Sequence, residues 1–317
     1  AVATVRYATR RALRVMAEVA ISMLVAPIAG NIHVSLGKGD LPTATLSTPG
    51  GASAEVCITG AHVTNWRLRD GSEQLFMSSA SNFVRGSAIR GGVPICFPQF
   101  SDRGSLQKHG FARTSDEWEI ESMSSERGIP RLVLCLADSD ATRAVWPNKF
   151  QLRYTVELHD QKLCMQMEVK NLGDTPIEFT TALHTYFRVA DVTRTRIRGL
   201  GGLQYQDNTM NGAQMEEAEA ELLSIRGEVD RVYLNAPDTL DILDGDLRRL
   251  QLRKHGFRDA VLWNLGPEKA SDMSDLGRGE WKHFVCVEAG AIGSPVSLSP
   301  GETFVASQEF WCGEAAP

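Results

Sequence analysis

Apolar and polar residues alternate strictly in two neighbouring segments near the middle of the chain. In LRYTVEL (152–158) every second residue is apolar, and LCMQMEVK (163–170) repeats the pattern after the turn sequence His-Asp-Gln-Lys. Successive side chains of a strand point to opposite faces, so a period of two is typical of a strand with one buried face. The two segments therefore predict an antiparallel hairpin whose apolar face lies on the core.

Five further segments are strand-like: AEVCIT (54–59), RLVLCL (131–136), IEFTTAL (177–183), FVCVE (284–288) and TFVASQEF (303–310). Clusters of Gly, Pro, Asp and Asn separate them, and these residues favour turns. Many short strands in one long stretch of chain predict a large all-β sandwich or barrel.

Helical periodicity is confined to the N-terminal arm (residues 1–35) and to MEEAEAELL (215–223), where we expect a helix. No internal repeat, low-complexity tract or linker divides the chain after residue 36. We therefore expect residues 36–317 to form one domain. With 43% hydrophobic and 23% charged residues the composition is that of a globular protein, which excludes a disordered or fibrous chain.

The N-terminal arm differs from the rest of the chain in charge. Its first acidic residue is Glu18, and four arginines precede it at helical spacing, at Arg6, Arg10, Arg11 and Arg14. This composition is typical of an organellar targeting segment, for a chloroplast or a mitochondrion. The apolar stretch VAISMLVAPIAG (19–30) is about half the ~20 residues of a spanning helix and contains Pro27, so no membrane span is expected. It is expected to dock on the domain, or alternatively on a membrane surface or a protein partner.

The overall charge restricts the partners. Thirty-three basic and thirty-nine acidic residues give a net charge of −6, the wrong sign for a general polyanion binder, so no nucleic-acid partner is expected. The six cysteines are scattered singly, without a C-x-x-C pair. That distribution favours a reducing compartment and implies no structural zinc.

Two neighbouring segments carry cationic side chains. In IRGGVPICFPQF (89–100), Arg90 precedes two glycines that can let the backbone approach a ligand closely. The loop KHGFAR (108–113) then holds Lys108, His109 and Arg113. Three cations so close together repel one another unless an anion lies among them, which indicates an anion site. Surface charges with solvated tips are the alternative, and the sequence does not decide between the two.

Two apolar strands carry a single reactive side chain each: His184 in TTALHTYFRV (180–189) and Glu288 in FVCVEAGAI (284–292). A lone histidine in such a strand is more often a hydrogen-bonded core or rim residue than a functional one. A buried carboxylate needs a cationic partner, a strand-mouth position or a shifted pKa. Together the two offer a general acid and a general base, but only the fold can bring them together.

These motifs resemble, in order, those of the glucose-6-phosphate 1-epimerase branch of the aldose 1-epimerase (galactose mutarotase-like) superfamily: IRGGVPICFPQF, HGFAR, ALHTYF, EVDRVYL (228–234), WN (263–264) and FVCVEAGAI. The resemblance runs from about residue 40 to the C-terminus. It implies a galactose mutarotase-like β-supersandwich, here with a short N-terminal helical arm, an open groove for the sugar, and no metal or organic cofactor.

The resemblance also implies roles for particular residues. His184 and Glu288 match the catalytic pair of the family, and the residues matching its sugar-binding positions are Arg90, His109, Arg113 and Asp230. Lys108 stands where the family usually carries Gln, so it adds a charge to the binding loop. Asp207, in YQDNT, lies near a turn and is expected to be structural.

The implied activity is that of a hexose-phosphate mutarotase, which interconverts the α and β anomers of glucose-6-phosphate by opening and closing the ring. Glu288 is expected to act as the base on the C1 hydroxyl and protonated His184 as the acid on the ring oxygen, about 5 to 8 Å apart. Arg90, Lys108 and Arg113 are expected to hold the phosphate of a hexose-6-phosphate. The alternative is a non-catalytic carbohydrate-binding protein or a structural subunit of a large organellar assembly.

Overall fold

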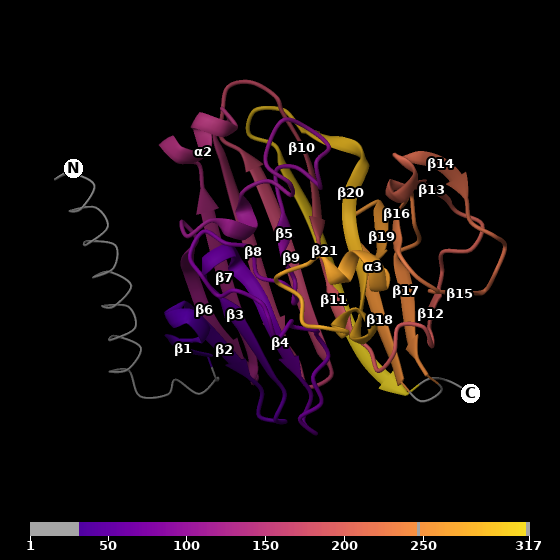
Figure 1. Cartoon of the computed structure of the whole chain (residues 1–317). Coiled ribbons are helices and arrows are strands. Elements are labelled where there is room, and N and C mark those ends of the chain that lie inside the picture. The colour runs from indigo at the N-terminus through magenta and orange to yellow at the C-terminus, as the bar shows by residue number, and fades with distance from the viewer. Residues whose placement is uncertain (1–31, 246–247, 315–317) are drawn as a thin grey trace.

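Strands make up most of the structure, a computed structural model that describes residues 32–245 and 248–314. They form three antiparallel sheets, which lie side by side and face to face (Figure 1). The all-β prediction is therefore confirmed. The expected N-terminal helix lies outside the described residues. The first strand, β1, is Ile32–Leu36, so residues 32–35, which the sequence analysis assigned to the arm, belong to the first sheet.

The smallest sheet has four strands in chain order: β1 (Ile32–Leu36), β2 (Pro42–Ser47), β3 (Ser53–Cys57) and β4 (His62–Arg67). Each strand pairs with the next in the chain through a short turn. The alternating burial of β2 places Ala44 and Leu46 in the core.

The second sheet has eight strands. Seven follow one another in the order β14 (Ala213–Glu216), β13 (Gln204–Asp207), β16 (Val229–Tyr233), β19 (Asp259–Asn264), β20 (Phe284–Leu298), β10 (Ile177–Leu183) and β5 (Ile95–Cys96). The eighth, β11 (Tyr186–Arg188), also pairs with β20. The long strand β20 thus lies between β19 on one side and β10 and β11 on the other (Figure 1).

The third sheet has nine strands, in the order β15 (Leu222–Ser224), β12 (Thr195–Arg198), β17 (Thr239–Asp244), β18 (Arg248–His255), β21 (Thr303–Glu314), β9 (Lys162–Asn171), β8 (Phe150–Leu158), β7 (Ile129–Ala137) and β6 (Glu119–Glu126). The hairpin expected from residues 152–170 is β8 and β9, paired from Phe150–Asn171 to Leu158–Leu163. Its predicted inner face is completely buried.

Helices are few and short among the described residues. The two α-helices are α2 (Asp140–Val145) and α3 (Gly266–Ser271), and the 3-10 helices are η1 (Lys38–Asp40), η2 (Thr59–Ala61), η3 (Ala112–Thr114), η4 (Asn208–Met210) and η5 (Glu280–His283). Helix α2 begins with a capping box, in which Ser139 and Thr142 each accept a hydrogen bond from the other's backbone N–H. No described helix is long and apolar enough to span a bilayer.

The prediction of a helix over residues 215–223 is wrong. This segment forms the ends of two edge strands, β14 and β15, with an exposed turn between them. The carboxylate of Glu217 accepts hydrogen bonds from the Tyr233 hydroxyl at 2.5 Å and from Arg231 Nη1 at 2.7 Å. These contacts to a neighbouring strand outweigh the helical propensity of Glu and Ala, which is a weak preference.

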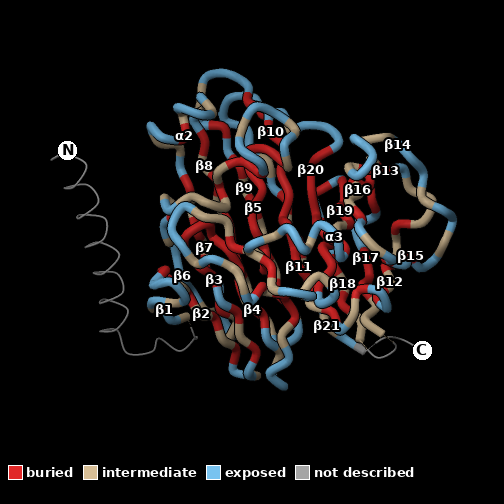
Figure 2. The backbone as a smooth tube through the Cα atoms, in the orientation of Figure 1, coloured by how far each residue is buried: buried red, intermediate tan, exposed pale blue. Residues whose placement is uncertain are grey.

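One continuous core joins the three sheets (Figure 2). Trp66 of β4 lies against Phe310 of β21, with ring centroids 6.2 Å apart, and Phe310 also contacts Phe187 of β11 at 4.7 Å. Phe97 and Phe150 extend the core toward β8, at 5.4 Å. The core therefore fixes the two large sheets against each other. The functional residues lie on the opposite face of the second sheet.

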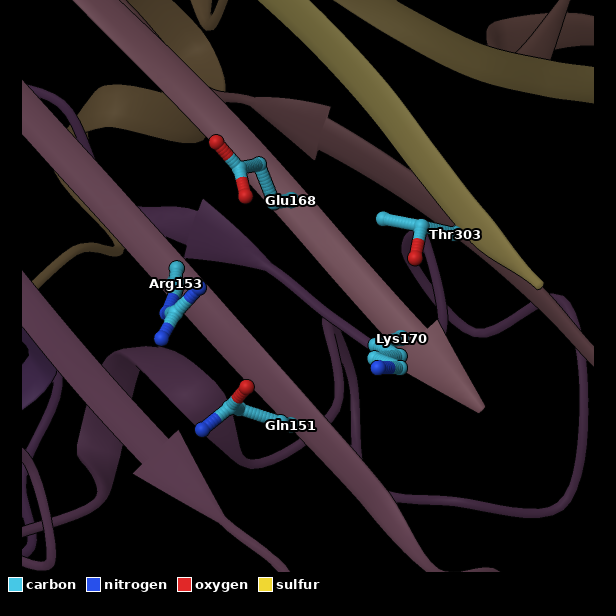
Figure 3. A pocket seen from close by; sticks show the side chains of 5 residues that line it. All are labelled: Gln151, Arg153, Glu168, Lys170 and Thr303. Atoms are coloured by element: carbon cyan, nitrogen blue, oxygen red, sulfur yellow. The ribbon is translucent and has the colours of Figure 1, made fainter. Parts of the chain in front are cut away.

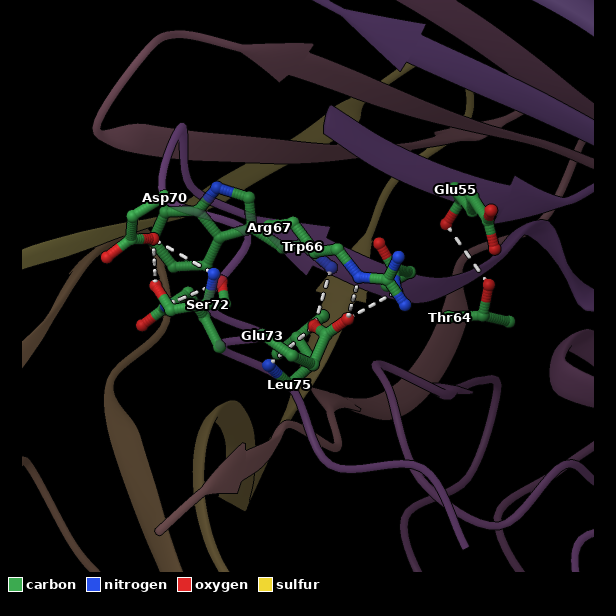
Figure 4. Close-up of polar contacts among 10 residues, drawn as sticks. Glu55, Thr64, Trp66, Arg67, Asp70, Ser72, Glu73 and Leu75 are labelled. Atoms are coloured by element: carbon green, nitrogen blue, oxygen red, sulfur yellow. Dashed lines mark hydrogen bonds and ion pairs between the residues drawn. The ribbon is translucent and has the colours of Figure 1, made fainter. Parts of the chain in front are cut away.

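A carboxylate fixes the start of the segment that leads to Arg90 (Figure 4). Glu73 accepts hydrogen bonds from the backbone N–H groups of Trp66 (2.9 Å) and Leu75 (3.0 Å), and it contacts the side chains of Asn65 and Arg67. Three residues further on, the N–H of Phe76 donates to the Tyr186 carbonyl at 2.9 Å. The chain that follows β4 is therefore held along β11.

Candidate active site

Glu288 lies in the middle of β20, where its neighbours Val287 and Ala289 point into the core. The alternation of the strand directs the Glu288 side chain to the opposite face, where it is 1% exposed. In register, Glu288 pairs with Val261 of β19, and Ala289 pairs with Leu183 at the end of β10. The residue after Leu183 is His184, so β10 delivers the histidine beside the carboxylate.

The two side chains predicted as the acid and base are in contact. Nδ1 of His184 lies 3.1 Å from Oε1 of Glu288, at an angle that is not that of a hydrogen bond. Nδ1 of His184 and Oε2 of Glu288 are both buried without a hydrogen-bond partner in the described part of the chain. The expected separation of 5 to 8 Å was therefore too long. O1 and the ring oxygen of a sugar are bonded to the same carbon, so two groups that exchange protons with them must lie close together.

Burial shifts both groups toward their neutral forms. It raises the pKa of Glu288 well above its usual value, and the negative charge of Asp230 raises it further. Burial also lowers the pKa of His184 well below its usual value, with the charges of Arg113 and Arg90 acting in the same direction. Burial therefore opposes the charged forms of both side chains in the free site.

Aromatic rings fix the orientation of His184. The ring of Tyr186 is stacked on it, with centroids 4.8 Å apart and planes 7° from parallel, and Trp263 meets its edge at 5.5 Å. The Tyr186 hydroxyl accepts a hydrogen bond from Arg90 Nη1 at 3.0 Å. Arg90 in turn donates from Nε to Oδ2 of Asp275 at 3.1 Å, and its Nη2 forms an ion pair with the same oxygen at 3.0 Å. The guanidinium of Arg90 is therefore bound to a carboxylate and a tyrosine hydroxyl within the protein.

The glycines after Arg90 serve backbone packing within the protein. A Cβ on Gly91 would lie 2.4 Å from the Phe76 carbonyl oxygen, and one on Gly92 would lie 2.2 Å from the carbonyl oxygen of Val63. Both residues also have positive φ angles, which glycine adopts at little cost. The expectation that they admit a ligand is therefore replaced by a structural reason.

The other histidine, His109, lies next to His184, with ring centroids 5.3 Å apart. Its Nδ1 accepts a hydrogen bond from the Ser101 N–H at 3.2 Å and lies 3.0 Å from Cys96 Sγ. Burial, and then the charges of Arg113, Lys108 and Arg90, lower its pKa to about 3. His109 is therefore neutral at pH 7, and with Nδ1 as the acceptor it carries its proton on Nε2.

Arg113 and Lys108 form the cationic side of the site. Arg113 Nη2 donates to the backbone carbonyl of Lys108 at 2.9 Å, and its buried Nε has no hydrogen-bond partner in residues 32–245 and 248–314. No described carboxylate lies within 4.0 Å of either side chain, so neither Asp102 nor Asp116, the acidic residues near this loop in the sequence, pairs with Arg113. Of the three cations expected together, Arg113 and Lys108 have no carboxylate partner among the described residues, and Arg90 is bound to Asp275.

Asp230 approaches from β16, where it pairs in register with Trp263. Burial raises its pKa, and its Oδ1 accepts a hydrogen bond from Asn208 Nδ2 at 2.7 Å. Asn208 is itself held by Arg103 Nη2 at 3.1 Å. Asp207 is structural, as expected, because its Oδ1 accepts from the N–H of Thr209 at the start of η4.

Residues of the site that had no predicted role include Arg103, Tyr186, Asn208 and Cys286. Tyr186 was within reach of sequence reasoning, since it follows His184 at the two-residue spacing of one strand face in ALHTYF. Cys286 has the same relation to Glu288 in FVCVEAGAI. Arg103 and Asn208 lie in loops without periodicity, so no signal marked them.

The geometry agrees with comparisons of the whole chain. The sequence profile of the aldose 1-epimerase family matches residues 42–311. The chain belongs to this family. Two relatives, from Cenchrus ciliaris and Escherichia coli K12, are 37% and 34% identical over 78% and 74% of this chain, and over 78% of each relative; both are named "Putative glucose-6-phosphate 1-epimerase". A solved Salmonella typhimurium structure, described as "a putative mutarotase", superposes with a TM-score of 0.83 at 26% identity, over 92% of this chain and 96% of that one.

This aldose 1-epimerase family member also has a polar hollow on the outer face of its nine-stranded sheet (Figure 3). The hollow is lined by Gln151, Arg153, Glu168, Lys170 and Thr303. Arg153 pairs in register with Glu168, and Gln151 with Lys170, so opposite or neutral side chains face each other across the strands. The hollow lies on a different sheet from the acid–base pair and is a solvated strand face.

Proposed function

We propose that this protein interconverts the α and β anomers of glucose-6-phosphate. The observation that carries the proposal is the 3.1 Å contact between His184 Nδ1 and Glu288 Oε1, with an unpartnered buried polar atom on each side chain. Unpartnered buried polar atoms are costly, so they indicate a ligand that hydrogen-bonds to both. A sugar hydroxyl and a ring oxygen offer a donor and an acceptor on neighbouring atoms.

The reaction needs one proton removed and one supplied. Glu288 takes the proton of the C1 hydroxyl while His184 gives a proton to the ring oxygen, and the bond between C1 and the ring oxygen breaks to leave an open-chain aldehyde. After rotation about the C1–C2 bond, His184 removes the proton from the former ring oxygen as it attacks C1, and Glu288 returns a proton to O1. Atoms and charge balance, and both side chains end as they began.

Burial opposes the charged forms of both side chains in the free site. A bound sugar donates a hydrogen bond from O1 to the carboxylate and accepts one at the ring oxygen. Both contacts stabilise the charged forms, so substrate binding favours protonated His184 beside ionised Glu288. Tyr186 and Trp263 hold the imidazole in the orientation that this transfer requires.

The preference for a phosphorylated sugar rests on Arg113 and Lys108. Both are cations without a carboxylate partner in the described part of the chain, and a guanidinium fork matches phosphate oxygens. The names of the relatives point to the same substrate. Asp230 and the Nε2–H of His109 provide an acceptor and a donor for the sugar hydroxyls.

The test is a measurement of anomer exchange at equilibrium, by saturation transfer between the two anomeric protons in NMR spectra. Glucose-6-phosphate, glucose and galactose would be compared at the same enzyme concentration. We expect exchange to be fastest with glucose-6-phosphate and to fall to the spontaneous rate with Glu288→Gln. Exchange no faster than the spontaneous rate with all three sugars would contradict the proposal.

A further inference from the structure

A third reactive side chain lies at the acid–base pair and takes no part in the proposed reaction. Cys286 precedes Glu288 by two residues on β20, so both project from the same face of the strand. A donor atom of Cys286, His184 and Glu288 each lies within 4.8 Å of the other two, and all three residues are buried. The cysteine is completely buried and forms no disulfide with any described residue.

The polar atoms of this trio are not satisfied by the protein. Nδ1 of His184 and Oε2 of Glu288 are buried without hydrogen-bond partners in the described residues. A sugar accounts for these two atoms but not for a thiol beside them. A thiol, an imidazole and a carboxylate together are the ligand types that zinc selects.

We propose that the trio His184, Cys286 and Glu288 binds Zn²⁺, and that the ion occupies the place of the sugar and inhibits the enzyme. The ion is an inhibitor and has no part in the reaction. With Cys286 as thiolate and Glu288 as carboxylate, the two ligand charges neutralise the metal. Coordination deprotonates a thiol outright, so a buried thiol is no obstacle.

The spacing suits a tetrahedral ion with one open position. Zinc–ligand bonds of about 2.0 to 2.3 Å place neighbouring donor atoms roughly 3.3 to 3.6 Å apart. The His184 and Glu288 atoms are already 3.1 Å apart. Moving the thiol from at most 4.8 Å to this range needs a shift of about 1 Å, which a small side-chain rotation supplies.

The surrounding charges are of both signs. Arg90 is neutralised by Asp275, and Asp230 is close enough to raise the pKa of Glu288. Arg113 and Lys108 oppose a cation, and they are the cations that attract a sugar phosphate. Zinc and the sugar phosphate are therefore expected to exclude each other.

A second cluster of the same ligand types serves as a control. Glu157, His159 and Cys164 lie on the hairpin of β8 and β9, partly exposed. There His159 Nε2 is already 2.8 Å from Glu157 Oε1, and Lys162 Nζ lies 3.5 Å from Glu309, the acidic neighbour of Cys164. Its polar atoms have partners and a fixed cation stands beside it, so we expect no metal binding there.

In the first experiment Co²⁺ is titrated into the protein. Co²⁺ binds at zinc sites and gives a near-ultraviolet charge-transfer band when a thiolate coordinates it. We expect the band with the wild type and with Cys164→Ala, and its loss with Cys286→Ala. Added Zn²⁺ should displace the band. No band in the wild type, an unchanged band in Cys286→Ala or a lost band in Cys164→Ala would overturn the proposal. Cys286→Ser provides a second variant if the alanine variant does not fold.

The second experiment measures inhibition and rests on the proposed function. Zn²⁺ should inhibit anomer exchange in competition with glucose-6-phosphate, and EDTA should reverse the inhibition. Removing one of three ligands should raise the inhibitory concentration by at least about tenfold in Cys286→Ala or Cys286→Ser, but not in Cys164→Ala. Non-competitive inhibition, or equal inhibition of all the variants, would overturn it. The cobalt band needs no turnover, so failure of the proposed function leaves the metal test intact.

Discussion

The ring of Tyr186 lies flat against that of His184, and its hydroxyl is held by Arg90, which is bound to Asp275. The stack and the hydrogen bond have separable effects. Tyr186→Phe keeps the stack, so we expect less than a tenfold loss of kcat for anomer exchange. Tyr186→Ala frees the imidazole, and a misplacement of about 1 Å costs on the order of 10²-fold.

The saturation-transfer assay described above measures both Tyr186 variants. Ring-current shifts of the His184 protons report the stack independently of activity. A loss with Tyr186→Phe as large as that with Tyr186→Ala would assign the effect to the hydroxyl and contradict the positioning role of the stack.

Removing either member of the acid–base pair should lower anomer exchange by on the order of 10² to 10⁴. Glu288→Gln keeps the volume of the original side chain and removes a buried ionisable group, so we expect the midpoint of urea unfolding to hold or rise while kcat falls. His184→Asn also removes an ionisable group, but its smaller side chain leaves space beside Tyr186 and Trp263, so a small fall in the midpoint is expected. Wild-type exchange in either variant would remove that residue from the mechanism.

The imidazole of His184 should remain neutral in the free enzyme when the pH falls through 6.5, the usual histidine pKa, because burial lowers its pKa well below that value. NMR titration of the histidine ring protons would check this, with His184→Asn to assign the signal. A saturating sugar phosphate should move the titration to higher pH, since the ring oxygen accepts from the protonated ring. A midpoint near 6.5 in the free enzyme would contradict the effect of burial.

The strands could be predicted because each needs only a local pattern, as in Phe150–Leu158, where every second residue faces the core. His184 and Glu288 were found through their motifs. Their 3.1 Å contact was not predictable from the chain, because it depends on the pairing of β10 with β20. The bond from Arg90 to Asp275 joins residues 185 positions apart, so Arg90 was assigned to the substrate alone.

The helix prediction for residues 215–223 was wrong because the local pattern misled, whereas the His184–Glu288 contact was missed because no local pattern encodes it. There the local pattern was helical, and the contacts of Glu217 with Arg231 and Tyr233 override it. Local propensity decides only where distant contacts do not compete.

The free energy of unfolding should decrease as the pH is lowered from 6.5 to 4, because of His62. This residue is fully buried, its Nε2 donates to the Gly91 carbonyl at 2.8 Å, and burial lowers its pKa to about 4. The unfolded chain, with a histidine pKa near 6.5, binds the proton first. The contribution of neutral His62 is therefore complete above pH 6.5 and declines as the pH falls to 4, by about 3 kcal/mol.

Urea unfolding of the wild type and of His62→Gln at pH 7 and pH 4 isolates this effect, since glutamine does not titrate. His109 and His184 add to the acid sensitivity of both proteins equally. We expect the wild type to lose about 3 kcal/mol more than the variant over this range. Equal losses in the two proteins would show that His62 does not couple folding to pH.

Specificity for the phosphate should depend on Arg113. Its guanidinium has no carboxylate partner among the described residues, so a phosphate group is its natural counter-ion. Charge-assisted contacts contribute about 1.5 to 3 kcal/mol, so Arg113→Ala should lower kcat/KM for glucose-6-phosphate by roughly 10- to 150-fold and hardly change it for glucose. Arg253→Ala, which removes an exposed arginine from β18, controls for overall charge. Equal losses for the two sugars would mean that Arg113 supports the loop through its bond to the Lys108 carbonyl and does not bind phosphate.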